Sequence, residues 1–507
     1  MSAQAGRTIA PTAMTDEEEL KSFGYEQQLN RSMGLLSSLS ISISCMCITA
    51  GIFTTFAYSL GLVGPAFVWT WLIVAIGQLL VAGVLAELAG RMPISGYAFQ
   101  WTSRLVNSHY GWFVGWAGLM AFTPGFTGLN LGLAPILMQR LGIDISPTTT
   151  LVVVVAITLS QLAINLAGVR IASRINNVAA FTAELGLSVV LTLILLVVGF
   201  VTHPVQSVGF LTTSSVSGND FPVAILLSGL LAIWVLTGFE GAADLAEETK
   251  LARKQVPRAV VTSLAVSIVI GFFMIVALTI NIDDLAATTG APVPITHILV
   301  SALGSTGAVI FEIVAMIALY AGGLANMAAA SRLLFSLSRD NMLPASSHLA
   351  TVSPRTHSPS WSLVVITALS VTLVTIGTYL ASQTMALIVG MAAVGYYAVY
   401  GLTIAAVIYA SIKGHLPVET SFSLGRWAGP IRWVALIWSI FVVAELVIPT
   451  ANQQTALMAG VFFVLSGLWY FAVLRGRLNR GEAGVPATIE RTSTPVSQQP
   501  LTDPRSS

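Results

Sequence analysis

Charged residues are scarce in this chain. Only 9% of its 507 residues are Asp, Glu, Lys or Arg, whereas 55% are hydrophobic. A soluble globular domain carries about 25% charged residues, so the composition excludes a water-soluble protein and indicates an integral membrane protein. The net charge of +1 gives no electrostatic reason to expect a nucleic-acid partner.

Cysteine is also rare, and its placement excludes a disulfide framework. Cys45 and Cys47 lie two positions apart in an apolar run, so on a helix they point to different faces and cannot pair. We interpret both as small core residues. The 6 histidines lie in loops or near helix ends, and no phosphate-binding Gly-x-x-x-x-Gly-Lys-Ser/Thr loop occurs. We therefore expect no metal, no cofactor, no enzyme activity and no use of ATP.

Long apolar runs, in contrast, are abundant. They are long enough to be membrane helices rather than barrel strands. The sequence predicts an all-α polytopic membrane protein with twelve transmembrane helices. The predicted spans are 35–58, 64–89, 110–138, 149–166, 176–201, 221–247, 256–280, 306–337, 361–380, 384–412, 431–448 and 455–474.

The placement of positive charge predicts the orientation. With both termini in the cytoplasm, the twelve-span arrangement puts every Lys and Arg except Arg140 on the cytoplasmic side, and cytoplasmic loops are enriched in these residues. We predict a multi-pass protein of the plasma (inner) membrane. Residues 1–34 form a cytoplasmic arm, with a short helix started by a capping box at Thr15 and Glu18. Residues 35–474 form the twelve-helix domain, and 475–507 a disordered cytoplasmic tail.

Two of the apolar runs are interrupted by small and polar residues. Residues 48–53 of the first read Ile-Thr-Ala-Gly-Ile-Phe, and residues 236–241 of the sixth read Leu-Thr-Gly-Phe-Glu-Gly. Backbone groups at such a break are tolerated in a membrane only where they line a cavity or meet a ligand. Because each half holds five spans, we predict inverted repeats over 35–201 and 221–412, followed by two further helices over 431–474. Matched breaks in inverted halves are typical of a secondary transporter with a site at the membrane midplane.

Four motifs carry a resemblance to a known family. Residues 234–249 (Trp-Val-Leu-Thr-Gly-Phe-Glu-Gly-Ala-Ala-Asp-Leu-Ala-Glu-Glu-Thr), 86–101 and 331–340 resemble the amino acid–polyamine–organocation superfamily. The arm, with Leu-Lys-Ser-Phe-Gly-Tyr at 20–25, is similar to the amino acid/choline branch, which includes 4-aminobutyrate and choline permeases. The resemblance implies a leucine-transporter-like fold. It also implies a permease that moves an amino acid or related small amine across the bilayer by alternating access. Because no ATP-binding loop occurs, we expect a proton gradient to drive transport.

The broken helices supply the candidate substrate site. Amides at a half-helix N-terminus suit a carboxylate, and carbonyls at a half-helix C-terminus suit an ammonium group. Glycine in a membrane helix often serves packing alone, but the matched pair of breaks favours a binding role. The expected substrate-binding residues are Thr49, Ala50, Gly51, Thr237, Gly238 and Phe239. By the resemblance, Trp234 closes over bound substrate, and Tyr396, Tyr397 and Trp116 are further candidates for the wall.

Acidic residues within the apolar runs form a second candidate set. Such groups usually mark proton relays or buried partners. By the resemblance, Glu240 braces the unwound segment or takes part in proton coupling, and Glu184 is a further candidate for proton coupling. For both, the alternative is a neutral, hydrogen-bonded structural carboxyl group. At the inner helix ends we expect ion pairs that open and close a cytoplasmic gate, formed by Glu87, Arg91, Arg332, Arg339 and Asp340. The alternative is that these residues only anchor the orientation.

Several functions remain open on the sequence alone. An exchanger of one amino acid or amine for another fits the same fold, and so does a choline or 4-aminobutyrate permease. A channel or receptor would explain twelve spans but not the matched breaks. The substrate itself is not determined, because selectivity depends on which residues of spans three, eight and ten face the site.

Overall fold

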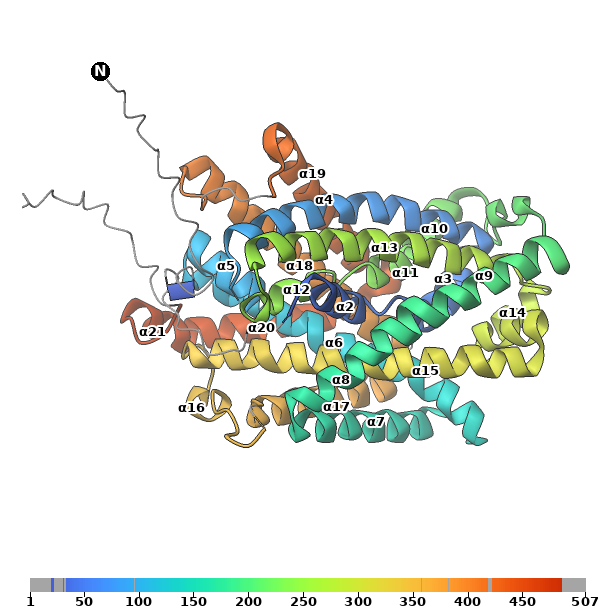
Figure 1. Cartoon of the computed structure of the whole chain (residues 1–507), viewed down its shortest axis with the longest axis horizontal. Coiled ribbons are helices and arrows are strands. Elements are labelled where there is room, and N and C mark those ends of the chain that lie inside the picture. Colours follow the sequence, from blue (N-terminus) through green and yellow to red (C-terminus); the bar gives the residue numbers. More distant parts are fainter. Residues whose placement is uncertain are drawn as a thin grey trace, which may run out of the picture.

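The computed structural model describes residues 20–21, 31, 33–94, 96–356, 358–381, 383–417 and 422–485. Within these residues the chain is helical apart from its turns and loops, and the single β-bridge there joins Met33 to Thr249 (Figure 1). The predicted capping box at Thr15 and most of the predicted tail lie outside the described residues. The all-α fold class is therefore confirmed.

Ten helical segments are long and apolar enough to cross a membrane. One of them, Leu35–Arg91, has 57 residues and contains α2 (Leu35–Met46), α3 (Ile48–Val63) and α4 (Thr70–Arg91). That length is enough for two crossings, since about 20 residues span the hydrocarbon core. The 34-residue α6 (Ser108–Leu141) is not among the ten. The chain is a polytopic membrane protein, and the exact count of twelve spans stays a prediction.

The remaining helical elements follow the predicted spans, except that α8 begins about seven residues early and α15 about twelve residues early, with a kink at Gly304 (φ of 69°). They are α7 (Pro147–Ala167), α8 (Val169–Ala179), the π-helical η2 (Ala180–Leu187), α9 (Ser188–Val197), α10 (Phe221–Ser228), α11 (Leu230–Val235), α12 (Gly241–Asp244), α13 (Ala252–Ile280), α15 (Pro294–Arg339), α17 (Ser360–Leu380), α18 (Thr384–Lys413), α19 (Ala428–Val447) and α20 (Gln453–Trp469). Most of the long helices run along the longest axis of the molecule (Figure 1).

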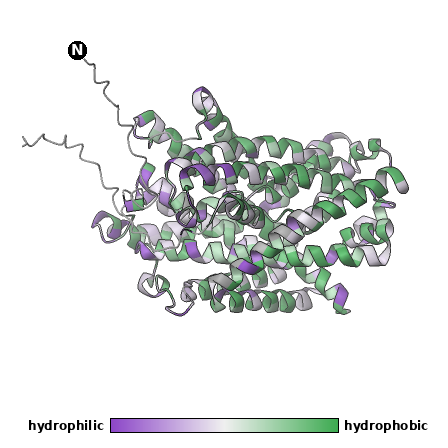
Figure 2. Ribbon diagram, viewed as in Figure 1, coloured by the Kyte–Doolittle hydropathy of each residue, from purple (hydrophilic) through white to green (hydrophobic). Residues whose placement is uncertain are grey.

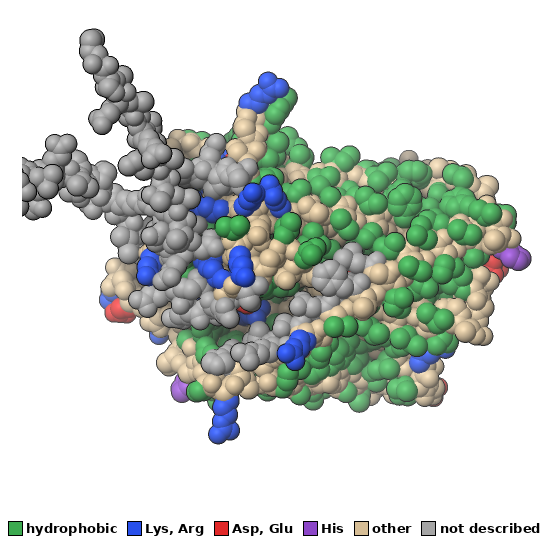
Figure 3. Space-filling model, in the orientation of Figure 1, with side chains coloured by type: hydrophobic (Ala, Val, Ile, Leu, Met, Phe, Trp, Pro, Cys, Tyr) green, Lys and Arg blue, Asp and Glu red, His purple; other side chains and the backbone are tan. Residues whose placement is uncertain are grey.

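The sides of the bundle differ in hydropathy from one of its ends. Hydrophobic residues cover the long sides, while hydrophilic residues gather at the end that carries α5 (Tyr97–Leu105) and α21 (Arg475–Asn479) (Figure 2). Most of the Lys and Arg side chains on the visible face also lie toward that end (Figure 3). It is the end that the charge pattern predicts to be cytoplasmic.

Close helix crossings hold the centre of the bundle together. α6 packs against both α15 and α18. A Cβ atom at Gly395 of α18 would lie 2.4 Å from the backbone nitrogen of Ala121 in α6, so the missing side chain is what lets these two backbones meet. Small residues at crossings are the usual way to pack helices in a bilayer, where no hydrophobic force draws one helix to another.

The first span breaks one residue before the predicted segment. Cys47, with φ of 52°, separates α2 from α3, and the prediction that the interruption lies within residues 48–53 is wrong. Those residues form the first turns of α3, in which the Gly51 amide donates to the Cys47 carbonyl at 2.8 Å. A positive φ is rare for a residue with a side chain. Here Cys47 is held by tertiary contact, because its Sγ donates to the Ala318 carbonyl at 3.1 Å.

The second break lies where the sequence predicts it. α11 ends at Val235, and α12 begins at Gly241. Between them Gly238 has φ of 85°, a conformation that glycine adopts without the steric cost of a Cβ atom. The sixth span is therefore two half-helices joined by a non-helical segment over residues 236–240.

Candidate substrate site

The two breaks lie against each other. A Cβ atom at Gly238 would be 3.0 Å from the Cys45 carbonyl oxygen, and one at Gly51 would be 2.7 Å from Cγ2 of Val235. Neither position has room for a side chain without a shift of its neighbour. The fold thus brings together the two segments that the sequence analysis paired, although they are far apart in the chain.

Side chains from neighbouring helices satisfy the backbone of the second break. Gln78 of α4 donates from Nε2 to the Leu236 carbonyl at 2.8 Å. The Gly238 amide donates to the Tyr400 hydroxyl at 3.3 Å. That hydroxyl in turn donates to the Glu240 carboxylate, at 2.9 Å from Oε2 and 3.1 Å from Oε1. Tyr400 of α18 therefore links Glu240 to the Gly238 backbone of the same segment.

The first break is held by a carboxylate at the start of α3. Oε2 of Glu184 accepts from the Thr49 amide at 3.1 Å and from the Thr49 hydroxyl at 3.0 Å. The Thr49 hydroxyl also lies 2.8 Å from Oγ of Ser188. A carboxylate is favoured at a helix N-terminus by the free amides and the helix dipole. The chain's own Glu184 thus occupies the position that the sequence analysis assigned to a substrate carboxylate.

Glu184 has one oxygen left over. Among the described residues, its Oε1 has no hydrogen-bond partner. The side chain borders a narrow space with Cys47 of the break, Ala179 at the end of α8 and Ala318 of α15. Glu184 itself comes from η2, a π-helical stretch, and π-helical turns inside longer helices are frequent at functional sites.

An aromatic cluster covers the second break. It consists of Phe122, Trp234, Phe239, Tyr396 and Tyr400, whose neighbouring rings lie 5.4–6.4 Å apart between centroids. Trp234 is 6% exposed, and a Cβ atom at Gly125 would be 3.5 Å from its ring. Trp234, the predicted gate residue, is therefore buried close to α6.

All of the predicted substrate-site residues and both acids are buried, namely Thr49, Ala50, Gly51, Trp234, Thr237, Gly238, Phe239, Glu184 and Glu240. Of the three further wall candidates, Tyr396 lies in the aromatic cluster. Trp116 instead faces α20, where its Nε1 donates to the Phe462 carbonyl at 2.8 Å. Because all of these site residues are buried, the structure shows the candidate site in a closed state.

The predicted gate residues form two clusters rather than one. Glu87 pairs with Arg91 at 2.8 Å and with Arg432 of α19 at 2.8 Å. Asp340, which follows α15, lies 3.8 Å from Arg339 and accepts from Gln100 at 3.0 Å. No ion pair of Arg332 occurs within the part of the chain that the structure describes. The role of these residues in a cytoplasmic gate stays a prediction.

Several partners at the breaks escaped the sequence analysis. Asn326 donates from Nδ2 to the Gly322 carbonyl at 3.0 Å and accepts from the Tyr396 hydroxyl at 3.3 Å. Ser42 accepts from the Ala242 amide at 2.9 Å. The sequence could have pointed to Asn326 and Gln78, because a polar side chain inside an apolar span usually forms a hydrogen bond to another helix. In the described residues, no group of three or more His, Cys, Asp and Glu side chains could hold a metal ion.

Comparison with known proteins found chains similar over nearly the whole length of this one. The profile of a family described as amino acid permease matches residues 33–473. An uncharacterized amino-acid permease of Schizosaccharomyces pombe is 25% identical, over 93% of this chain and 89% of that protein. Amino-acid permease BAT1 of Arabidopsis thaliana is 23% identical, over 92% of this chain and 96% of that protein. Its homolog in Oryza sativa subsp. japonica is 24% identical, over 90% of this chain and 93% of that protein.

The hydroxyl of Tyr400 should matter for stability. Tyr400→Phe removes the donor to Glu240 and the acceptor for the Gly238 amide, and leaving buried polar groups without partners costs about 1–3 kcal/mol. We expect a lower melting temperature of the purified protein in detergent. Tyr397→Phe is the matched control on the same helix, because the Tyr397 hydroxyl has no hydrogen-bond partner among the described residues. Equal melting temperatures for both variants would contradict the bracing role of Tyr400.

The carboxyl group of Asp340 should make stability depend on pH. Burial raises its pKa to about 6 from the ordinary 3.8, against the opposing effects of Arg339, Gln100 and Arg104. Because the folded-state pKa is the higher one, the charged form opposes folding above about pH 6, and this penalty fades as the pH falls.

The difference in melting temperature between wild type and Asp340→Asn isolates this effect. We expect wild type to gain stability relative to the variant when the pH is lowered from about 7.5 to 5. Thermal unfolding of both proteins in the same buffers measures the difference. A difference that stays constant across this range would mean that Asp340 does not titrate there.

Proposed function

Because the chain belongs to the amino acid permease family, we propose that it is a secondary transporter of an amino acid or a related small amine. It works by alternating access, and uptake is coupled to protons. The observation that carries the proposal is the contact of the Glu184 carboxylate with Thr49 at the N-terminus of α3. The proposed membrane is the plasma (inner) membrane, with both termini in the cytoplasm.

Glu184 and a substrate carboxylate would compete for the same amide. The α3 N-terminus offers few free N–H groups, and the Thr49 amide already donates to Glu184. Two carboxylates at this place would repel each other in a region with little water. A proton on Glu184 removes its charge and frees the amide for the substrate. Proton and substrate therefore bind together, as symport requires.

Closure of the site supports alternating access. The break glycines leave no gap between the two helices, and Trp234 and Phe239 are buried beside them. A substrate therefore enters only after α2 and α3 move relative to α11 and α12. The half-helices can swing about the left-handed Cys47 and the flexible Gly238, since broken helices are the moving parts in this class of fold. The ion pairs of Glu87 lie where they would hold the predicted cytoplasmic side closed.

Exchange is the second candidate mechanism for this family fold. An exchanger needs substrate on both sides and no proton. Glu184 contacts Thr49 at the start of α3, so a change in its charge acts directly on the proposed substrate site, and this position favours symport.

Uptake into proteoliposomes tests the proposed function. The purified chain is given radiolabelled neutral amino acids, basic amino acids, 4-aminobutyrate, polyamines and choline in turn, with an imposed proton gradient. We expect one class to accumulate. Gly238→Ala should reduce its uptake roughly tenfold or more, since an alanine in a left-handed conformation costs about 1–2 kcal/mol and its Cβ would crowd the Cys45 carbonyl.

The same substitution elsewhere is the control. A Cβ atom at Gly460 on α20 would have no neighbouring heavy atom within 4 Å, so Gly460→Ala should leave uptake unchanged. Absence of uptake for every compound, with folded protein verified by size-exclusion chromatography, would refute the proposed transport function. Uptake that needs internal substrate and survives collapse of the proton gradient would establish exchange instead.

Glu184→Gln separates coupling from binding. The amide side chain carries no charge at any pH, so substrate should still bind and exchange across the membrane. Accumulation driven by a proton gradient should be lost. Gradient-driven uptake measures coupling, and exchange of labelled for unlabelled substrate without a gradient measures binding and transport. Both are measured in the same vesicles.

Glu445→Gln is the matched control for this variant. Glu445 is also a buried glutamate within a span, but it lies on α19 and has no hydrogen bond to the broken helices among the described residues. We expect it to keep gradient-driven uptake. Accumulation by Glu184→Gln at the wild-type level would exclude Glu184 as the coupling group.

A further inference from the structure

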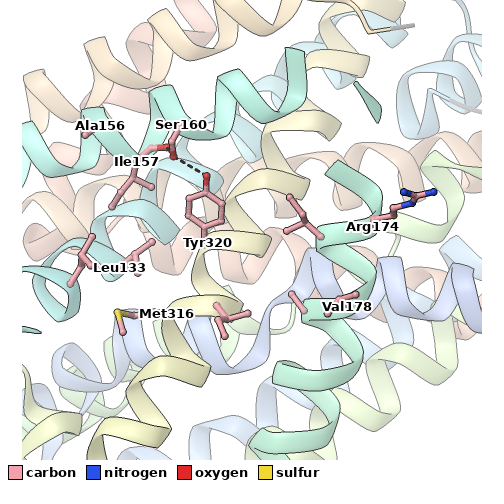
Figure 4. A pocket seen from close by; sticks show the side chains of 12 residues that line it. Leu133, Ala156, Ile157, Ser160, Arg174, Val178, Met316 and Tyr320 are labelled. Carbon is pink, nitrogen blue, oxygen red and sulfur yellow. Dashed lines mark hydrogen bonds between the residues drawn. The ribbon is translucent and has the colours of Figure 1, made fainter. Parts of the chain in front are cut away.

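A large apolar groove lies on the side of the bundle, next to the narrow space beside Glu184, with which it shares Ala179. Its volume is about 820 Å³, and its walls come from α6, α7, α8 and α15 (Figure 4). Small-molecule sites in proteins occupy about 300–1,000 Å³, so the groove has the size of a ligand site. No residue of the aromatic cluster lines it.

The groove opens toward the lipid-facing surface. Two of its lining residues are largely exposed, Val178 at 64% and Ile317 at 45%. On a membrane-spanning protein, such exposed aliphatic side chains on the flank of the bundle meet hydrocarbon chains. Because the groove faces the bilayer, a lipid is the expected ligand rather than a solute from the aqueous phase.

The polar groups in the groove wall are already paired with each other. The hydroxyls of Ser160 and Tyr320 lie 2.8 Å apart in a hydrogen bond (Figure 4). A polar ligand would have to compete for that bond, whereas an acyl chain needs no hydrogen bond. The chemistry of the wall thus favours an acyl chain between α7 and α8.

One charged residue stands at the edge of the groove. Arg174 lies on α8 (Figure 4), about one and a half turns after the helix begins at Val169. Its side chain is exposed. The charge pattern predicts this part of α8 to be near the cytoplasmic face. Arginine binds phosphate strongly and in a defined geometry, and the cytoplasmic leaflet is rich in anionic lipids.

We propose that the groove between α6, α7, α8 and α15 is a binding site for an anionic phospholipid. One acyl chain lies between Ile157 and Met316, and the phosphate binds Arg174. The lipid also touches Ala179, which lines both this groove and the narrow space beside Glu184. Lipid in the groove therefore stabilises the end of α8, from which η2 and Glu184 continue. The effect on transport rests on the proposed function, while the binding site does not.

Photo-crosslinking in proteoliposomes tests the site. The full chain is reconstituted with phosphatidylglycerol that carries a diazirine in its acyl chain, and labelled peptides are mapped by mass spectrometry. We expect labels on α7 and α15 within the groove, displaced by excess phosphatidylglycerol but not by phosphatidylcholine. Arg174→Gln should lower the labelling about fivefold, since one basic residue contributes about 1 kcal/mol to binding of an anionic lipid.

Two pairs of variants keep the test sharp. Ala156→Trp fills the groove from an exposed position on α7 and should abolish the labelling, whereas Ala163→Trp, exposed on the same helix but outside the groove, should not. Arg258→Gln removes another exposed arginine and should leave the labelling unchanged. Size-exclusion profiles show that each variant is folded.

Other results would overturn the proposal. Labels spread evenly over the outer helix faces would mean annular lipid only. Groove labelling that phosphatidylcholine displaces equally well, or that Arg174→Gln leaves intact, would exclude recognition of an anionic headgroup. Labelling as expected in a protein that transports none of the tested compounds would support the lipid site and count against the proposed function alone.

Discussion

The central constraint on this fold is that backbone groups at a helix break within a membrane need partners. Water cannot supply them in the hydrocarbon core, and an unsatisfied group costs several kcal/mol. Here the partners are side chains of neighbouring helices. Gln78 serves the Leu236 carbonyl, Tyr400 serves the Gly238 amide, and Glu184 serves the Thr49 amide. The breaks exist because α4, α18 and η2 are in place around them.

The same dependence makes the breaks easier to rearrange than a helix interior. A helix interior has its hydrogen bonds within one segment and resists rearrangement, whereas these breaks use single bonds to other helices. Each such bond contributes only about 0.5–1.5 kcal/mol net, so it can be exchanged for a bond to a ligand at little cost. Close glycine contacts at Gly51 and Gly238 keep the closed arrangement compact without locking it through interdigitated side chains. On the proposed mechanism, this combination allows the site to close and reopen around a small solute.

The sequence allowed prediction of the helices and of the second break, but not of the first. Apolar runs mark spans wherever lipid is the solvent, and Gly238 has a positive φ, which glycine adopts at lower cost than residues with a side chain. Cys47 gives no such signal. Its left-handed backbone is set by the contact with Ala318, which lies 271 residues away in the sequence, so no local pattern announces it. Arg432 was missed for a similar reason, because the pairing of α19 with Glu87 depends on which helices become neighbours.

The position of Glu184 also bears on which substrate class can be carried. On the proposed mechanism, an amino acid brings a carboxylate that displaces Glu184 from the Thr49 amide, so a proton must enter with it. Choline has no carboxylate and does not compete for that amide. It would instead be attracted by the charged form of Glu184, and its uptake would fall on acidification rather than rise. The N-terminal arm resembles a branch that includes carriers of both kinds of compound. The sign of the pH response therefore identifies the substrate class through the charge that the substrate presents to α3.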